Sequence, residues 1–213
     1  ADGSILQKPY SGLTGMRTKT AYSKELALDG IESLAPVEGQ QIELSGEFTV
    51  ASGSCGFNFL KSGGKQASLS YDAENGTLTL DMTSLDRTVN DDTYGGIYAV
   101  TLPKKVALGD KLKLHVYLDG SIADIFVNDT WAYSVRIFPN DAAQVEAEAF
   151  ATAQMQADLK AWTLDATQNG DTGIDDIRMS QPTDGYLYDI LGRRQSSAHK
   201  GICIQNGKKY VGR

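Results

Sequence analysis

Two glutamates late in the chain have the spacing that best suits acid–base chemistry. Glu146 and Glu148 stand two positions apart, and in a β-strand rising ~3.3 Å per residue they would share one face at roughly 6.5–7 Å. Carboxylate pairs at such separations can exchange protons with a substrate during hydrolysis. However, Val145, Ala147 and Ala149 would lie opposite them, which is also the pattern of an ordinary solvated strand face. We prefer that second interpretation and expect no catalytic residue here.

Several aromatic residues have the flat rings that sugar binding requires. Carbohydrate sites combine such a ring, stacked on an apolar sugar face, with polar groups that orient the hydroxyls. Trp131 and Tyr133 would share one strand face, and Tyr94, Trp162 and Tyr117 are further candidates. The alternative, which is favoured, places Trp131 and Tyr133 in the core or in a surface packed against another domain.

No residue pattern predicts a metal or cofactor site. The two cysteines, Cys55 and Cys203, are too far apart in sequence to fit a zinc site or a disulfide framework, so two unpaired thiols are expected. The polar segment 169–176 offers oxygen ligands but lacks the spacing of a calcium-binding EF-hand. His115 and His199 have no partner pattern around them and are expected to be exposed or satisfied.

Composition narrows the classes of partner. The 213 residues carry a formal net charge of −7, and an acidic surface repels phosphate backbones and anionic headgroups. We therefore expect no nucleic-acid partner. The chain also lacks the run of ~18 apolar residues that a membrane-spanning helix needs, so no membrane insertion is expected. The charge does not exclude neutral polymers, such as polysaccharides, as partners.

Alternation of apolar and polar residues indicates an all-β protein. From Ile42 onward the period is two, and the alternating runs end in turn residues, mostly with glycine, as in an antiparallel sandwich or barrel. The clearest hairpin is 111–128, turned by Asp119-Gly120, because these residues tolerate the positive φ of hairpin turns. Further strands are expected at 131–138, 144–151 and 154–164.

The C-terminal part has a different composition. Residues 166–176 are rich in Gly, Asn, Asp and Thr and are typical of a linker. Residues 177–213 contain two short hairpin patterns, the second turned by Asn206-Gly207. We interpret 177–213 as a tail module.

The segment 112–139 resembles a known family. It reads LKLHVYLDGSIADIFVNDTWAYSVRIFP and is similar to the C-terminal sandwich of glycoside hydrolase family 32, the family of invertases, inulinases and levanases. Gly120 stands where that family usually has arginine, and Asp124 where it has glutamate. The upstream segment 69–82 also resembles strands of the family, with Met82 where arginine is common. The matching residues to which the resemblance assigns a structural role are Asp119, Asp124, Phe126, Asn128, Arg136 and Pro139.

The beginning of the chain carries the same resemblance. Residues 3–17 resemble the connector that leaves the last propeller blade of these enzymes and enters the sandwich, although Gly12 replaces its usual glutamate. The resemblance implies a connector at 1–40 from an upstream propeller and a sandwich domain at 41–165. The implied fold is all-β, a two-sheet antiparallel β-sandwich (jelly-roll, concanavalin-like) plus a small C-terminal β-hairpin appendage.

The resemblance also implies a function. The family's catalytic carboxylates lie in the propeller, in Asn-Asp-Pro-Asn, Arg-Asp-Pro and Glu-Cys motifs, and this sequence contains none of these motifs. It therefore implies a non-catalytic accessory domain that packs against the catalytic β-propeller of the same parent chain, a fructan-cleaving glycoside hydrolase. The alternative is a carbohydrate-binding module for the β-fructans levan and inulin. Neither role needs a cofactor.

The tail carries a separate resemblance. It is similar to short C-terminal modules of exported proteins from the Bacteroidetes, at Tyr188-Asp189, Gly192-Arg193, Lys200-Gly201-Ile202 and 206–209. This implies that the protein is secreted, displayed on the cell surface or periplasmic.

Overall fold

β-Strands make up most of the chain. The structure is a computed structural model that describes residues 5–85, 87–89, 92–138, 145–165, 167, 186–189, 193–195, 201–205 and 208–212. The chain divides into two units, Ala1–Gln168 and Asn169–Arg213. Most of the predicted linker 166–176 lies outside the described residues.

The first unit begins with a short 3-10 helix and continues in strands. Its elements are η1 (Ser11–Met16), β1 (Arg17–Glu38), β2 (Gln41–Thr49), β3 (Ser54–Ser62), β4 (Lys65–Asp72), β5 (Thr77–Asp81), β6 (Arg87–Val89), β7 (Asp92–Tyr94), β8 (Ile97–Thr101), β9 (Lys111–Asp119), β10 (Ile122–Val127), β11 (Trp131–Arg136) and β12 (Glu146–Leu164).

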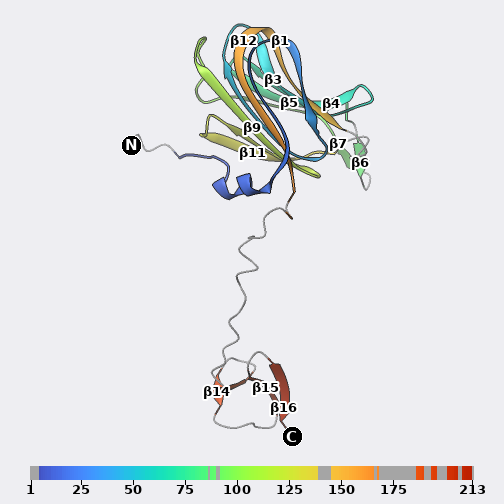
Figure 1. Cartoon of the computed structure of the whole chain (residues 1–213), viewed down its shortest axis with the longest axis vertical. Coiled ribbons are helices and arrows are strands. Elements are labelled where there is room, and N and C mark those ends of the chain that lie inside the picture. Colours follow the sequence, from blue (N-terminus) through green and yellow to red (C-terminus); the bar gives the residue numbers. More distant parts are fainter. Residues whose placement is uncertain are drawn as a thin grey trace. The chain divides into compact units, whose positions relative to one another are not determined.

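One antiparallel sheet curls into the two layers of a sandwich. Its ten strands follow the order β11-β10-β9-β2-β12-β3-β4-β5-β8, with β1 paired to β12. Strand β12 joins the layers, because its residues 157–163 pair with β2 and its residues 146–151 pair with β3. Figure 1 shows β12 in orange beside β1 in blue. The predicted all-β antiparallel sandwich is confirmed, and its two layers are hydrogen-bonded through one shared strand.

Strands β1 and β12 are longer than the sequence pattern predicted. Residues 17–38, which the resemblance assigned to a connector, form a 22-residue strand that pairs with β12 from Arg17 to Glu38, with three shifts in register. The two strands expected at 144–151 and 154–164 are one 19-residue strand. The residues between them, Thr152-Ala153, include no glycine, proline, asparagine or aspartate that would favour a turn.

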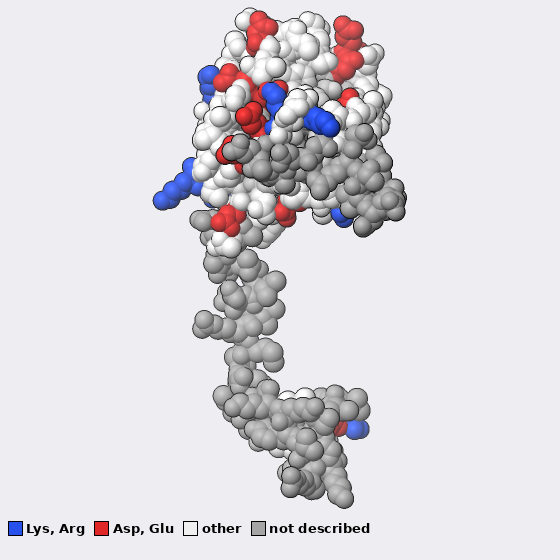
Figure 2. Space-filling model, turned by 90° about the vertical axis from the view of Figure 1, so that its right-hand side faces the viewer, with Lys and Arg blue, Asp and Glu red and all other residues white. Residues whose placement is uncertain are grey.

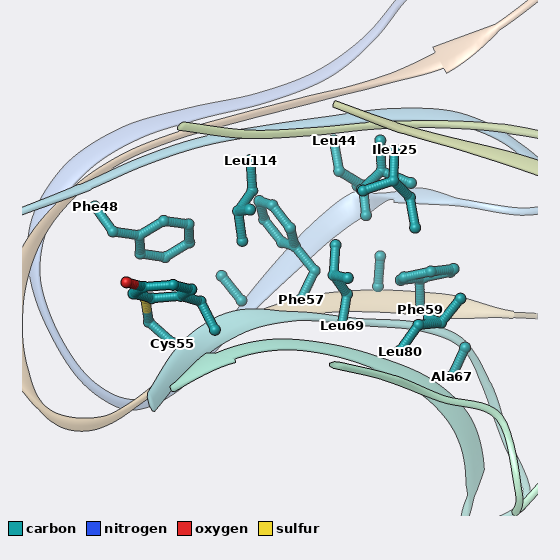
Figure 3. Packing of buried hydrophobic residues seen from close by; sticks show 14 of the residues in the cluster. Leu44, Phe48, Cys55, Phe57, Phe59, Ala67, Leu69, Leu80, Leu114 and Ile125 are labelled. Carbon is teal, nitrogen blue, oxygen red and sulfur yellow. The ribbon is translucent and has the colours of Figure 1, made fainter. Parts of the chain in front are cut away.

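The core lies between the two layers. Figure 3 shows Leu44, Phe48, Leu114 and Ile125, from β2, β9 and β10, facing a set from β3, β4 and β5 that includes Phe57. The rings of Phe48 and Phe57 meet edge to face at 5.7 Å, and both residues are fully buried. Burial of side chains of this size contributes roughly 1.5–3 kcal/mol each. The alternation seen in the sequence therefore points apolar residues inward from both layers.

The backbone of β3 and β4 approaches too closely for a side chain at Gly56. A Cβ atom added there would lie 1.9 Å from the carbonyl oxygen of Leu69.

The predicted 111–128 hairpin is present in the opposite layer as β9 and β10. Its turn residues are Gly120 and Ser121, one position later than expected. Gly120 has φ 57°, which glycine adopts without steric cost.

The second unit contains a small sheet. Its strands β13 (Leu187–Asp189), β14 (Arg194–Gln195), β15 (Gly201–Gln205) and β16 (Lys208–Gly212) follow the order β14-β13-β15-β16. Strands β15 and β16 pair antiparallel, with Gln205 opposite Lys208, as the predicted hairpin requires; its turn residues Asn206-Gly207 lie outside the described part.

Candidate functional site

The outer face of the β10-β9-β2-β12 layer carries rows of polar and aromatic side chains. On β2, inward residues Ile42 and Leu44 alternate with outward Glu43 and Ser45. The strand register places Glu43 between Tyr117 on β9 and Trp162 on β12. Because side chains directly opposite in a sheet are neighbours, residues far apart in sequence meet on this face.

Glu43 is the centre of an ion-paired cluster. Its Oε1 accepts hydrogen bonds from Arg17 Nη2 at 2.6 Å and from His115 Nε2 at 2.7 Å, and its Oε2 accepts one from Arg17 Nε at 2.7 Å. The Arg17 guanidinium also lies 3.6 Å from the centre of the Trp162 ring, a cation–π arrangement. We call Arg17, Glu43, His115, Tyr117 and Trp162 the Glu43 cluster.

Electrostatics favour the charged form of Glu43. Its side chain is fully inaccessible to solvent; burial alone would raise its pKa, but the hydrogen bonds from Arg17 and His115 outweigh this and hold the pKa at about 2. Burial, together with the nearby Glu43 carboxylate, raises the pKa of Tyr117. A carboxylate that accepts three hydrogen bonds from Arg17 and His115 is positioned to hold β1, β2 and β9 together.

A hollow opens on the same face beside the Glu43 cluster. It has a volume of about 250 Å³, and we call it the Ser45 hollow. The register places Ser45 between His115 on β9 and Lys160 on β12, so a short side chain stands between two long ones. Its walls include His115, Phe126, Asp129, Asp158 and Lys160.

A larger groove lies at one end of the sandwich. It has a volume of about 770 Å³ and is lined by segments 102–106, 109–111, 127–128 and 130–131, Trp131 among them. The N-terminal segment reaches the same end, because the Gln7 N–H donates to the Asp129 carbonyl at 2.8 Å. We call segments 5–10, 102–111 and 127–131 together the connector end.

A comparison with known protein families identifies the family to which the chain belongs. The model of the family "Glycosyl hydrolases family 32 C terminal" matches residues 12–163. The chain belongs to this family. No curated protein sequence matches it.

Solved structures with the same fold include enzymes of bacteria, fungi and plants. Sucrose-6-phosphate hydrolase from Lactobacillus gasseri is 21% identical, with a TM-score of 0.58 over 78% of this chain and 32% of that chain. Exo-inulinase from Aspergillus awamori is 18% identical, with a TM-score of 0.58 over 76% and 33% of the two chains. Fructan 1-exohydrolase IIa from Cichorium intybus is 15% identical, with a TM-score of 0.53 over 75% and 38%. The chain thus spans about a third of the length of each.

Among the aromatic residues predicted to bind sugar, those whose side chains the structure describes do not form one platform in this family 32 C-terminal domain. The rings of Trp131 and Tyr133 lie 4.9 Å apart on β11, partly buried against the core. Burial raises the pKa of Tyr133. Trp162 lies on β12, which three strands separate from β11 in the sheet order, and belongs to the Glu43 cluster. The side chain of Tyr94 is outside the described part.

The residues that match the family motif make local contacts in the β9–β11 region. Asp119 accepts a hydrogen bond from Gln41 at 3.1 Å, and Asp124 accepts one from Ser134. Phe126 packs edge-on against Tyr117 at 6.5 Å.

Two further motif residues lie near the β10–β11 turn and the end of β11. Asn128 Oδ1 accepts a bond from the Lys113 N–H at 2.8 Å, with the Asn128 backbone at φ 51°. The Arg136 guanidinium lies 5.2 Å from the Phe138 ring centre. Pro139 is outside the described residues.

Glu146 and Glu148 on β12 were predicted to lie on a solvated strand face, and this prediction is wrong for Glu148. Glu148 is only 6% exposed, accepts a hydrogen bond from Asn58 Nδ2 at 2.9 Å and pairs with Lys61. Glu146 is exposed, and an irregularity in the β12–β3 register separates the two. The physical reason is that this stretch of β12 pairs with β3, which places the polar side chains of Asn58 and Lys61 beside Glu148. The carboxylate of Glu148 serves an ion pair.

The expectation for Cys55 is confirmed. It is a free, buried thiol on β3, and burial raises its pKa to about 12. In the residues that the structure describes, no group of three or more His, Cys, Asp or Glu side chains is arranged to hold a metal ion. The helical part of the described chain offers no segment long and apolar enough to cross a membrane.

Sequence reasoning missed the Glu43 cluster. His115 was expected to be exposed or satisfied, and Glu43 satisfies it. The only signal in the sequence was an acidic residue between Ile42 and Leu44 in a strand pattern. Its partners stand 26 and 72 positions away, and only the strand pairing brings them together.

Proposed function

We propose that this chain is the non-catalytic accessory β-sandwich of a fructan-cleaving glycoside hydrolase, which packs against the catalytic β-propeller of the same parent chain and stabilises it. Membership of the family 32 C-terminal group supports the first half. The named hydrolases that share the fold are about three times as long as the matched part. This supports the view that catalysis belongs to another part of the parent protein.

The observation that carries the docking half is the apolar surface of the connector end. Ile5, Leu6 and Tyr10 are 78%, 61% and 76% exposed, and Leu108, beside the 770 Å³ groove, is 67% exposed. Exposed apolar groups gathered in one region mark interaction surfaces. A domain joined through residue 5 enters beside this surface, because Gln7 is hydrogen-bonded to the Asp129 carbonyl.

Such an interface has an expected size. Interfaces between domains of one chain bury roughly 600–1,500 Å², and an exposed leucine that becomes fully buried contributes roughly 1.5–3 kcal/mol. Replacing Leu108 with a charged residue is therefore the most direct test of docking.

The test compares the parent enzyme with its Leu108→Asp variant. The gene is first extended upstream of Ala1 to the catalytic domain, and the half-life of fructan hydrolysis is then measured at elevated temperature. We expect Leu108→Asp to shorten the half-life and the 213-residue chain alone to release no fructose from sucrose, levan or inulin.

Ile97→Asp is the matched control. Ile97 is 61% exposed on β8, in the other layer of the sandwich. Equal loss of half-life in both variants, or none in Leu108→Asp, contradicts docking at the connector end. Release of fructose by the 213-residue chain contradicts the non-catalytic role.

A second candidate function is the binding of β-fructans such as levan or inulin. The groove with Trp131 at its edge favours it, because an accessible indole can stack on a sugar ring. Retention of the chain in a levan- or inulin-containing gel, lost in Trp131→Ala, supports this function. Unchanged retention in that variant contradicts a site at Trp131.

The tail resemblance supports a proposal on location. We propose that the protein acts outside the cytoplasm, as a secreted, cell-surface or periplasmic protein. Fractionation of the source cells, with detection of the tail by an antibody against 186–212, tests it; recovery only in the cytoplasmic fraction contradicts it.

A further inference from the structure

The Ser45 hollow has the size of a single sugar ring. Its 250 Å³ is below the ~300 Å³ at which pockets for drug-sized ligands begin. The hollow exists because of the register: Ser45 and Gly46 form its floor, while longer side chains of β9, β10 and β12 surround them. A ligand of one ring would rest on the middle of the layer.

The charges around the hollow nearly cancel. Glu47, Asp129 and Asp158 supply carboxylates, and Lys113 and Lys160 supply ammonium groups. Lys160 lies 2.6 Å from Asp158, and Lys113 lies 3.8 Å from Asp129. Such pairs offer donors and acceptors side by side, which suits neighbouring hydroxyl groups. An anionic ligand would instead need an excess of positive charge, so a neutral polyol fits best.

One wall of the hollow is aromatic and fixed in place. His115 stacks on Tyr117 at 4.9 Å with 23° between the rings, and Tyr117 packs edge-on against Phe126. The bond from His115 to buried Glu43 holds the stack at its base. Because the wall is ordered before any ligand arrives, binding costs less conformational entropy. The Glu43 cluster thereby gains a role beyond stability: it positions His115 and, through Tyr117, Phe126.

We propose that the Ser45 hollow binds one uncharged sugar residue, with Phe126 and His115 against the ring and the Asp158–Lys160 and Asp129–Lys113 pairs on its hydroxyls. This site differs from the groove at Trp131, although Asn128 lines both. The proposal does not depend on docking at the connector end, since binding is measured on the 213-residue chain alone. The proposed function contributes only the choice of fructans as probes.

The test is affinity electrophoresis of the chain in gels containing levan or inulin, with free fructose as competitor. We expect retention that fructose relieves. Phe126→Ala should weaken it by about tenfold, the loss of ~1.4 kcal/mol expected for one aromatic contact. Ser45→Leu should abolish retention by filling the hollow, with an unchanged melting temperature because position 45 faces outward.

Matched controls use the other layer. Tyr98→Ala removes an exposed aromatic ring from β8, and Ser68→Leu enlarges an outward serine on β4; both should keep full retention. No retention of the unmodified chain on either polymer overturns the proposal, and so does an equal loss in the controls. Loss in Trp131→Ala with full retention in Phe126→Ala moves the site to the groove and also overturns it. None of these results bears on the Leu108 test of docking.

Discussion

Replacing Glu43 with glutamine tests the account of the Glu43 cluster most sharply. The substitution keeps the size of the side chain but removes the charge that Arg17 and His115 contact. In the folded protein the pKa of Glu43 is about 2, against 4.5 for an unperturbed glutamate. At about 1.4 kcal/mol per pH unit, the charged carboxylate contributes about 3 kcal/mol to the free energy of unfolding at neutral pH.

The sign of the pH dependence follows from the lowered pKa. A group that is easier to ionise in the folded state stabilises the protein fully above its unfolded pKa and loses this effect as the pH falls through its folded pKa. The difference in stability between the unmodified protein and Glu43→Gln should therefore be about 3 kcal/mol at pH 7. It should shrink as the pH falls from 4.5 toward about 2.

The assay is urea unfolding at a series of pH values, followed by tryptophan fluorescence. Comparing the two proteins at each pH cancels the titration of the other carboxylates. Glu74→Gln, at an exposed position, is the matched control and should change the free energy of unfolding by no more than ~0.5 kcal/mol. A Glu43→Gln cost below ~0.5 kcal/mol, or one that stays constant from pH 7 to pH 2, would refute the reasoning.

Three further predictions concern the interior. Glu148→Gln should not change any hydrolysis of fructans by the chain and should lower the free energy of unfolding by about 1–3 kcal/mol, since Lys61 loses its charged partner. A hydrolytic activity that depends on Glu148 contradicts the ion-pair role. Gly56→Ala should destabilise by at least ~3 kcal/mol in urea titrations, because the new Cβ meets the Leu69 carbonyl oxygen at 1.9 Å; a milder cost would mean that β3 and β4 separate easily. Cys55, buried and with a pKa of about 12, should react with a thiol reagent at pH 8 only as fast as the sandwich unfolds, and a rapid reaction in the native protein contradicts its burial.

The apolar pattern was sufficient to predict the layers of the sandwich. Leu112, Leu114, Val116 and Leu118 alternate along β9 and are all fully buried, because a period of two fixes which face of a strand is apolar. The same pattern could not show that β12 is one strand. Local sequence defines where turns are favoured, but β12 continues through Thr152-Ala153 because β1 pairs with it on both sides of this point, at Ala151 and Met155, across a shift in register.

The candidate sites depended on pairings that the sequence does not display. The sequence assigned Phe126 only a structural role. It did not indicate Ser45 as a site residue, because a serine in a strand does not by itself point to a binding site. The hollow arises from what stands opposite Ser45 on two neighbouring strands. Trp131 could be predicted as a candidate because an aromatic ring by itself is a residue type suited to sugar stacking.

The shared strand β12 sets the order in which the sandwich can be completed. Its partner β1 lies at the other end of the domain's sequence, with Arg17 opposite Leu164, so a growing chain cannot close the sheet until its last strand has left the ribosome. Until then β2 and β3 each present an unpaired edge, which is open to pairing with other chains. Pairings between such distant segments also slow folding. A stop codon anywhere before β12 therefore leaves two half-sheets with nothing to join them, and the product should be found in inclusion bodies rather than as a smaller stable domain.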